Sequence, residues 1–125
     1  MTKYLKIAYW VFTALFSAIM LFSANMYLTQ YEMVKGFFET LGYPVYLIYP
    51  LAILKIIGVI TLLANFNVTL KEWAYAAFFF EIILAFFAHY MIKDGGESTA
   101  ILAMILLLSS YFLWKKTSIN LKKEN

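Results

Sequence analysis

The chain has 125 residues, of which 64% are hydrophobic, 20% aromatic and only 14% charged. A water-soluble domain carries about 45–50% apolar and about 25% charged residues, and one of this length has too much surface to hide a larger apolar share. These proportions exclude an ordinary soluble domain and a disordered chain, and they indicate a protein embedded in a lipid bilayer. The chain has no cysteine, which excludes disulfides, thiolate metal sites and iron–sulfur clusters.

Four apolar runs predict four transmembrane helices, because about 20 helical residues cross a hydrocarbon layer of about 30 Å. The first run is longer than the about 7–15 residues of a signal-peptide core and lacks a small-residue cleavage site, so we expect it to remain as a helix. The fold class is therefore all-α, an integral membrane four-helix bundle. It forms one transmembrane domain over residues 1–125, with helices expected at 7–28, 46–64, 73–92 and 99–114 and a basic tail at 115–125.

The lysines indicate how the chain is oriented in the membrane. In a four-span chain, both termini and the second connection lie on one side, which here holds seven lysines: Lys3, Lys6, Lys71, Lys115, Lys116, Lys122 and Lys123. The other side holds two, Lys35 and Lys93. The positive-inside rule therefore predicts that both termini are cytoplasmic and that the protein lies in the cell (inner, cytoplasmic) membrane. The net charge of +3 follows from this topology and does not predict a nucleic-acid partner.

The first outer connection is predicted to form a short amphipathic helix that lies on the outer membrane surface. Its apolar residues recur at helical spacing, at Tyr31, Val34, Phe38 and Leu41. Gly42 then supplies a C-terminal stop. An unstructured loop is the alternative.

The third and fourth helices begin with capping patterns. Thr69 and Glu72 have the spacing of a capping box, which predicts that the third helix begins near Leu70. The outer turn at residues 94–98 ends in Ser98, which we expect to cap the N-terminus of the fourth helix.

Two charged residues stand near the middle of predicted spans, where a charge costs about 2.5–3.5 kcal/mol on insertion scales. Lys55 is the tenth of 19 residues in the run 46–64, and Glu81 is the ninth of 20 in the run 73–92. Because these consecutive helices are antiparallel, both side chains are expected at nearly the same depth. We therefore expect Lys55 and Glu81 to pair, directly or through a water, in the centre of the bundle.

Small residues near this pair predict where helices approach one another closely. The predicted packing stripe comprises Gly58 on the second helix and Ala77, Ala85 and Ala88 on the third. The first helix carries a small or polar stripe of its own, formed by Ala14, Ser17, Ala18, Leu21 and Asn25. The remaining faces of the third helix are rich in phenylalanine, which suits lipid or a flat ligand.

His89 lies near the outer end of the third helix, about 12 Å above Glu81 at helical rise. A line from outer water through Asp94 and His89 to Glu81 is one route for protons, because histidine titrates near neutrality. Two simpler interpretations stay open. In one, the Lys55–Glu81 pair serves only to fix helix register; in the other, His89 serves only to satisfy its own hydrogen bonds.

Several short motifs follow one another along the chain: Leu41–Pro44, Lys55–Gly58, Leu62–Leu63, Leu70–Ala76, Ala88–His89 and Lys93–Gly95. In their order and spacing they resemble the DoxX-like family of small four-helix membrane proteins, over about residues 6–116. Ala77 stands where the family pattern often has glycine, and it keeps a small side chain there.

The resemblance implies a function only in outline. The wider family takes its name from a subunit of a quinone-linked oxidoreductase, which implies a quinone as ligand and a separate redox partner protein. It also implies that Lys55, Glu81 and His89 line the interior of the bundle. Three further residues complete the candidate polar set: Ser17, Asn25 and Tyr43.

Three functions agree with these features. The first is an accessory subunit of a membrane redox system that binds a quinone or a similar flat lipid. The second is a small proton-coupled transporter with Glu81 as the proton carrier, and the third is a structural or assembly protein. Catalysis by this chain alone is not expected, because it lacks a nucleophile–base pattern, a phosphate loop and metal-ligand spacing. The helices either close on themselves or pair in a homodimer.

Overall fold

The computed structural model describes residues 2–124, with side chains described for residues 3–117. The described chain is helical: α1 (Thr2–Thr29), α2 (Tyr31–Leu41), the 3-10 turn η1 (Val45–Leu47), α3 (Ile48–Ala64), α4 (Val68–Ile92) and α5 (Glu97–Glu124). Four segments are long and apolar enough to cross a membrane, and they correspond to α1, η1 with α3, α4 and α5. The prediction of four transmembrane helices is confirmed. The side chains of Lys122 and Lys123, counted above as part of a basic tail, lie outside the described residues.

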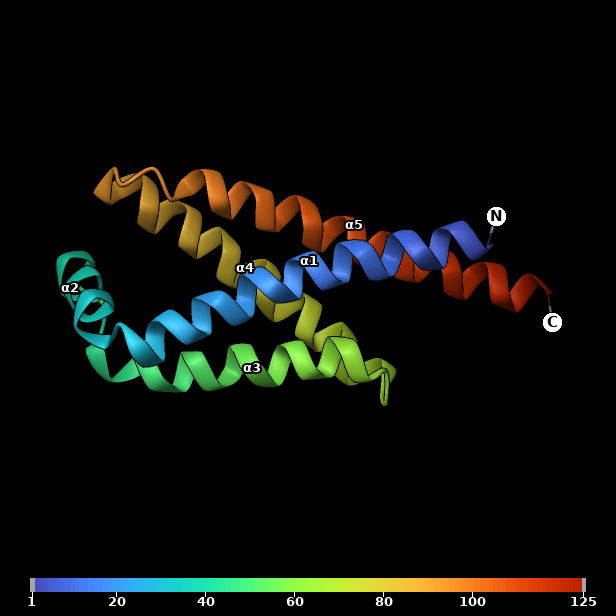
Figure 1. Cartoon of the computed structure of the whole chain (residues 1–125), viewed down its shortest axis with the longest axis horizontal. Coiled ribbons are helices and arrows are strands. Elements are labelled where there is room, and N and C mark those ends of the chain that lie inside the picture. The colour runs from blue at the N-terminus through green and yellow to red at the C-terminus, as the bar shows by residue number, and fades with distance from the viewer. Residues whose placement is uncertain (1, 125) are drawn as a thin grey trace.

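The helices form an elongated bundle with α1 at its centre (Figure 1). α1 packs against both α3 and α5, and α4 packs against α5. The start of α1, the end of α5 and the α3–α4 connection lie toward one end, whereas α2 and the α4–α5 connection lie at the other (Figure 1). An even number of spans puts both termini at the same end of the bundle. The assignment of that end to the cytoplasm stays a prediction from the lysine distribution.

The core lies where α1, α4 and α5 meet, and α3 covers one side of it. Phe16 of α1 and Phe78 of α4 pack edge to face with ring centroids 5.0 Å apart. Leu62 of α3 and Leu107 of α5 are fully buried in the same cluster. Large apolar side chains such as Phe22 also cover the outside of the helices, and lipid rather than water suits such a surface.

The segment between α1 and α3 contains the short helix α2. Its Val34 and Phe38 side chains are buried against Ile48, the first residue of α3. Gly42 ends the helix in the left-handed conformation, with φ of 78°, and its N–H donates to the Glu39 carbonyl. The position of α2 on the outer membrane surface stays a prediction.

The predicted helix caps are wrong. α4 begins at Val68, and its cap is Asn67, whose Oδ1 accepts a hydrogen bond of 3.0 Å from the Leu70 N–H. The Thr69–Glu72 capping box is therefore absent. Ser98 lies inside α5, which begins one residue earlier at Glu97, so it is not the cap. α4 starts earlier than expected because Asn67, in an extended conformation, satisfies a first-turn N–H as well as a threonine does.

The predicted small-residue stripe on α4 is displaced around the helix. Ala77 is exposed, whereas Ala74, Phe78 and Ile82 are buried. Gly58 does mark a close approach, because a Cβ atom at this position would lie 2.6 Å from Phe78 Cζ. The helices therefore meet through a glycine facing an aromatic ring, whereas Ala85 and Ala88 are half-buried.

The stripe predicted on the first helix is likewise displaced. Of its five members, Ser17 alone is buried, and Ala14, Ala18, Leu21 and Asn25 are exposed. The buried face of α1 is carried by Tyr9, Thr13, Phe16, Met20 and Ala24 together with Ser17. Neighbouring helix positions are about 100° apart, so a stripe chosen one residue off lies largely on the lipid side.

Candidate functional site

The two mid-span charges lie together. The Lys55 Nζ of α3 is 3.1 Å from Glu81 Oε1 of α4, which is the ion pair expected from their depth. The side chain of Lys55 is 7% exposed and that of Glu81 is 30% exposed. The ammonium is thus enclosed by the bundle, whereas the carboxylate keeps one side open.

Helix α1 supplies two further contacts to Lys55 that the sequence did not predict. Lys55 Nζ donates a hydrogen bond of 2.6 Å to Ser23 Oγ, and it lies 4.1 Å from the ring centroid of Tyr27. Ser23 and Tyr27 are four residues apart, so they share one face of α1. That spacing, opposite a lysine at mid-span, is the sequence feature that could have found them.

An ammonium group has three protons and no acceptor. Ser23 accepts a hydrogen bond from Lys55, Glu81 forms an ion pair with it, and the Tyr27 ring lies over its charge. The open partner is the Glu81 carboxylate, which has two oxygens and can accept a hydrogen bond or a proton from another molecule. The pair therefore ties α1, α3 and α4 together and presents one acceptor outward.

The remaining candidate polar residues do not join this site. Asn25 and Tyr43 are exposed, and Tyr43 packs with its ring against Phe38 of α2. Ser17 is buried, but its hydroxyl has no hydrogen-bond partner among the described residues. Asn25 and Tyr43 are therefore wrong as members of a polar core.

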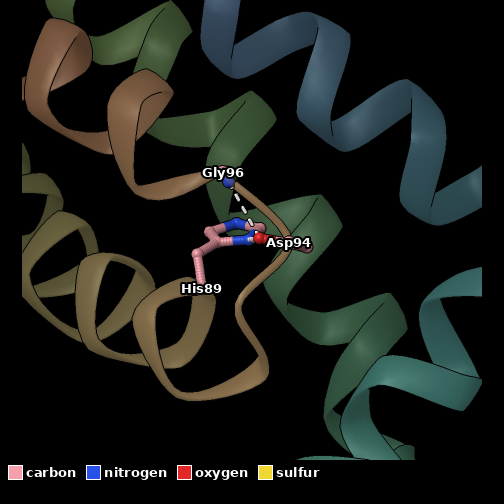
Figure 2. Close-up of polar contacts among 3 residues, drawn as sticks. All are labelled: His89, Asp94 and Gly96. Atoms are coloured by element: carbon pink, nitrogen blue, oxygen red, sulfur yellow. Dashed lines mark hydrogen bonds and ion pairs between the residues drawn. The ribbon is translucent and has the colours of Figure 1, made fainter.

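His89 makes its contacts at the turn between α4 and α5. Its Nδ1 lies 2.9 Å from both carboxylate oxygens of Asp94, and Asp94 Oδ1 also accepts a hydrogen bond of 2.8 Å from the Gly96 N–H (Figure 2). Burial raises the pKa of the Asp94 carboxyl, but the hydrogen bonds from Gly96 and His89 outweigh it, so the pKa lies below its usual range. The cluster closes the turn that leads into α5.

A proton route from this turn to Glu81 is not continuous along α4. His89 and Glu81 are eight residues apart, which is about 12 Å at helical rise. All seven residues between them, 82–88, are apolar. His89 and Glu81 therefore belong to separate polar groups, and no side chain of α4 connects them.

A second buried lysine, which was assigned above to a loop, lies near the other end of the bundle. Lys71 is 2% exposed in the first turns of α4. Its Nζ donates a hydrogen bond of 2.5 Å to Tyr9 OH and another to Asn65 Oδ1, and it lies 4.6 Å from the Trp114 ring centroid. With either cap, the observed Asn67 or the expected Thr69, Lys71 lies in the first turn of the helix rather than in the connection, and this is the sequence feature that could have found it.

Among the described residues, no group of His, Asp or Glu side chains is arranged to hold a metal ion. Buried polar residues inside four apolar helices instead define a multi-pass membrane protein with a polar site in its interior.

The family model of the DoxX-like family matches residues 11–112 of the chain. The protein therefore belongs to the DoxX-like family, as the order of its motifs predicts. No curated protein and no solved structure matches the chain.

Proposed function

We propose that this protein is an accessory subunit of a membrane redox system and that Lys55 and Glu81 bind the polar head of a lipid-soluble quinone. The observation that supports this function best is the partly exposed Glu81 carboxylate beside a buried ammonium. A carboxylate with one open side can accept a hydrogen bond from a ligand.

The open acceptor of the pair fits the reduced form of such a ligand. A quinol hydroxyl donates a hydrogen bond, for which Glu81 is the acceptor, and the enclosed Lys55 ammonium holds that carboxylate in place. The bound quinone or quinol would supply the electron chemistry. The protein residues would bind and orient the head group and exclude water from it.

The surface beside Glu81 suits a ligand that arrives from the lipid. One turn to either side on α4, Ala77 and Leu84 are exposed, and Phe80 next to Glu81 is exposed as well. On α3, Leu54 is exposed one residue before Lys55. An apolar surface around one carboxylate allows lateral entry of an apolar molecule with a polar head.

Calorimetric titration of the detergent-solubilised protein with a short-chain ubiquinol, kept reduced, tests this proposal. We expect saturable binding that Glu81→Gln weakens at least tenfold, because the amide no longer carries the charge. Glu32→Gln, a matched change at an exposed carboxylate of α2, should leave the affinity unchanged. Absence of saturable binding, or equal affinities for the wild type and Glu81→Gln, would overturn the proposal.

A proton carrier is the second candidate, and the same open carboxylate favours it. Its protonation would compete with the contact to Lys55 and so would link proton uptake to the packing of α3 against α4. In proteoliposomes with an imposed pH gradient and an enclosed pH-sensitive dye, a carrier dissipates the gradient and Glu81→Gln abolishes this. A quinone-binding subunit leaves the gradient intact in both proteins.

A further inference from the structure

Lys71 is a buried cation without an anionic partner among the described residues. The groups that contact its ammonium are the Tyr9 hydroxyl, the Asn65 amide oxygen and two aromatic rings, all of them neutral. The nearest carboxylate in sequence, Glu72, pairs with Lys115 instead. Burial of an ammonium is costly unless an anion or several hydrogen bonds compensate it, so the charge of Lys71 is only partly balanced within the chain.

A cavity of about 400 Å3 lies beside this ammonium. It is many times larger than the about 30 Å3 that one water occupies in the liquid. Besides Lys71, its lining contains a second cation and several hydrogen-bonding or aromatic side chains: Lys6, Tyr9, Trp10, Asn65, Asn67, Trp114 and Thr117. No acidic residue is among them.

Two details of the lining favour an anionic ligand. The Thr117 Oγ1 atom is buried and has no hydrogen-bond partner among the described residues. Val68, the first residue of the 25-residue helix α4, also borders the cavity. The N–H groups and the dipole of a helix N-terminus add to the attraction of the two lysines for a negative charge.

We propose that this cavity is a phosphate-binding site, with Lys71 and Lys6 as its cationic ligands. Phosphate oxygens accept hydrogen bonds from ammonium, amide and hydroxyl groups together, and these are the donors that line the cavity. The site lies where α3, α4 and α5 reach the end of their apolar segments, which is the depth of lipid head groups. The phosphate therefore belongs either to a lipid head group or to a small soluble anion.

Thermal unfolding of the purified full-length protein in detergent distinguishes these sources. The probes are dihexanoyl phosphatidylglycerol, the corresponding uncharged dihexanoyl glycerol, and inorganic phosphate against chloride at equal ionic strength. We expect the phospholipid, but not the uncharged lipid, to raise the unfolding temperature in a saturable way. An equal rise with inorganic phosphate would support the site and identify a free phosphate as sufficient.

Single-residue variants test whether the rise in the unfolding temperature comes from binding in this cavity. We expect Lys71→Met to weaken binding at least tenfold and Lys6→Met, at an exposed position that does not endanger folding, to weaken it severalfold. Lys116→Met removes a lysine that does not line the cavity and should change nothing. The proposal is overturned if neither phosphate probe stabilises the wild type, or if Lys71→Met and Lys6→Met are stabilised as strongly as the wild type and Lys116→Met.

Discussion

The two buried lysines of this protein are balanced in different ways. Lys55, at mid-span, has a carboxylate 3.1 Å away, and it does not line the cavity beside Lys71. Lys71, near the end of the spans, has only neutral partners among the described residues and borders that cavity. A cation at the centre of the membrane is out of reach of soluble anions, so the chain supplies the anion itself. A cation at the level of the head groups can receive its anion from outside.

Replacement of each lysine by methionine should give the largest difference between the two sites in the free energy of unfolding. Lys55→Met leaves the Glu81 carboxylate without its partner, and we expect a loss of about 3 kcal/mol in the free energy of unfolding. Lys71→Met leaves only a hydroxyl and an amide unsatisfied, so a loss of about 1 kcal/mol is expected. Reversible unfolding in mixed micelles measures both values. Equal losses would show that the two lysines are balanced alike.

The close approach of α3 and α4 beside the Lys55–Glu81 pair should be the next most sensitive feature. Gly58→Ala drives a methyl group into the Phe78 ring, and overpacking of this kind costs about 1–3 kcal/mol. Gly36→Ala in α2 is the matched control, because nothing lies within 4 Å of a Cβ atom there. Unfolding free energies provide the readout, and a neutral Gly58→Ala would contradict the contact.

The start of α4, next to Lys71, provides a smaller effect. Asn67→Ala removes the observed cap and should cost about 1 kcal/mol, whereas Thr69→Ala should cost nearly nothing. The same unfolding assay measures both variants. The reverse order of losses would restore the capping box expected from the sequence.

The turn at Asp94 should give the smallest effect, since it is exposed to solvent. Its pKa is lower in the folded protein than in the unfolded chain, so the ionised carboxylate stabilises the fold at neutral pH. This contribution is present above the unfolded-state pKa and is lost as the pH falls through the folded-state pKa. Wild type should therefore be more stable than Asp94→Asn at pH 7, and the difference should vanish in acid. If the difference in stability between wild type and Asp94→Asn stays the same from pH 7 into acid, the ionised carboxylate is not its source.

The sequence predicts well how deep a residue lies in the membrane, and it predicts poorly how a helix is rotated about its axis. Counting residues placed Lys55 and Glu81 at one level, because helical rise is the same for every residue. Which side of α1 faces Lys55 depends on how the helix is rotated, and packing against three neighbours sets this rotation. Ser23 and Tyr27 were missed for this reason, and Asn25 was wrongly included.

The burial of Lys71 was missed for a different reason. Charged residues near the ends of apolar runs are normally solvated, so a lysine just before the expected span 73–92 was counted as part of the second connection. The Asn67 cap extends the helix around it, and Tyr9 and Trp114, which come from the two ends of the chain, close over it. Contacts between residues so far apart in sequence cannot be predicted from local pattern.

The most direct test of this account is a double-mutant cycle on the mid-membrane pair. Unfolding free energies are measured for wild type, Lys55→Met, Glu81→Leu and the double variant. If the two charges stabilise each other, the double variant loses at least about 1 kcal/mol less than the sum of the single losses. Strictly additive losses would mean that Lys55 and Glu81 do not interact, and the proposed site would then have no basis.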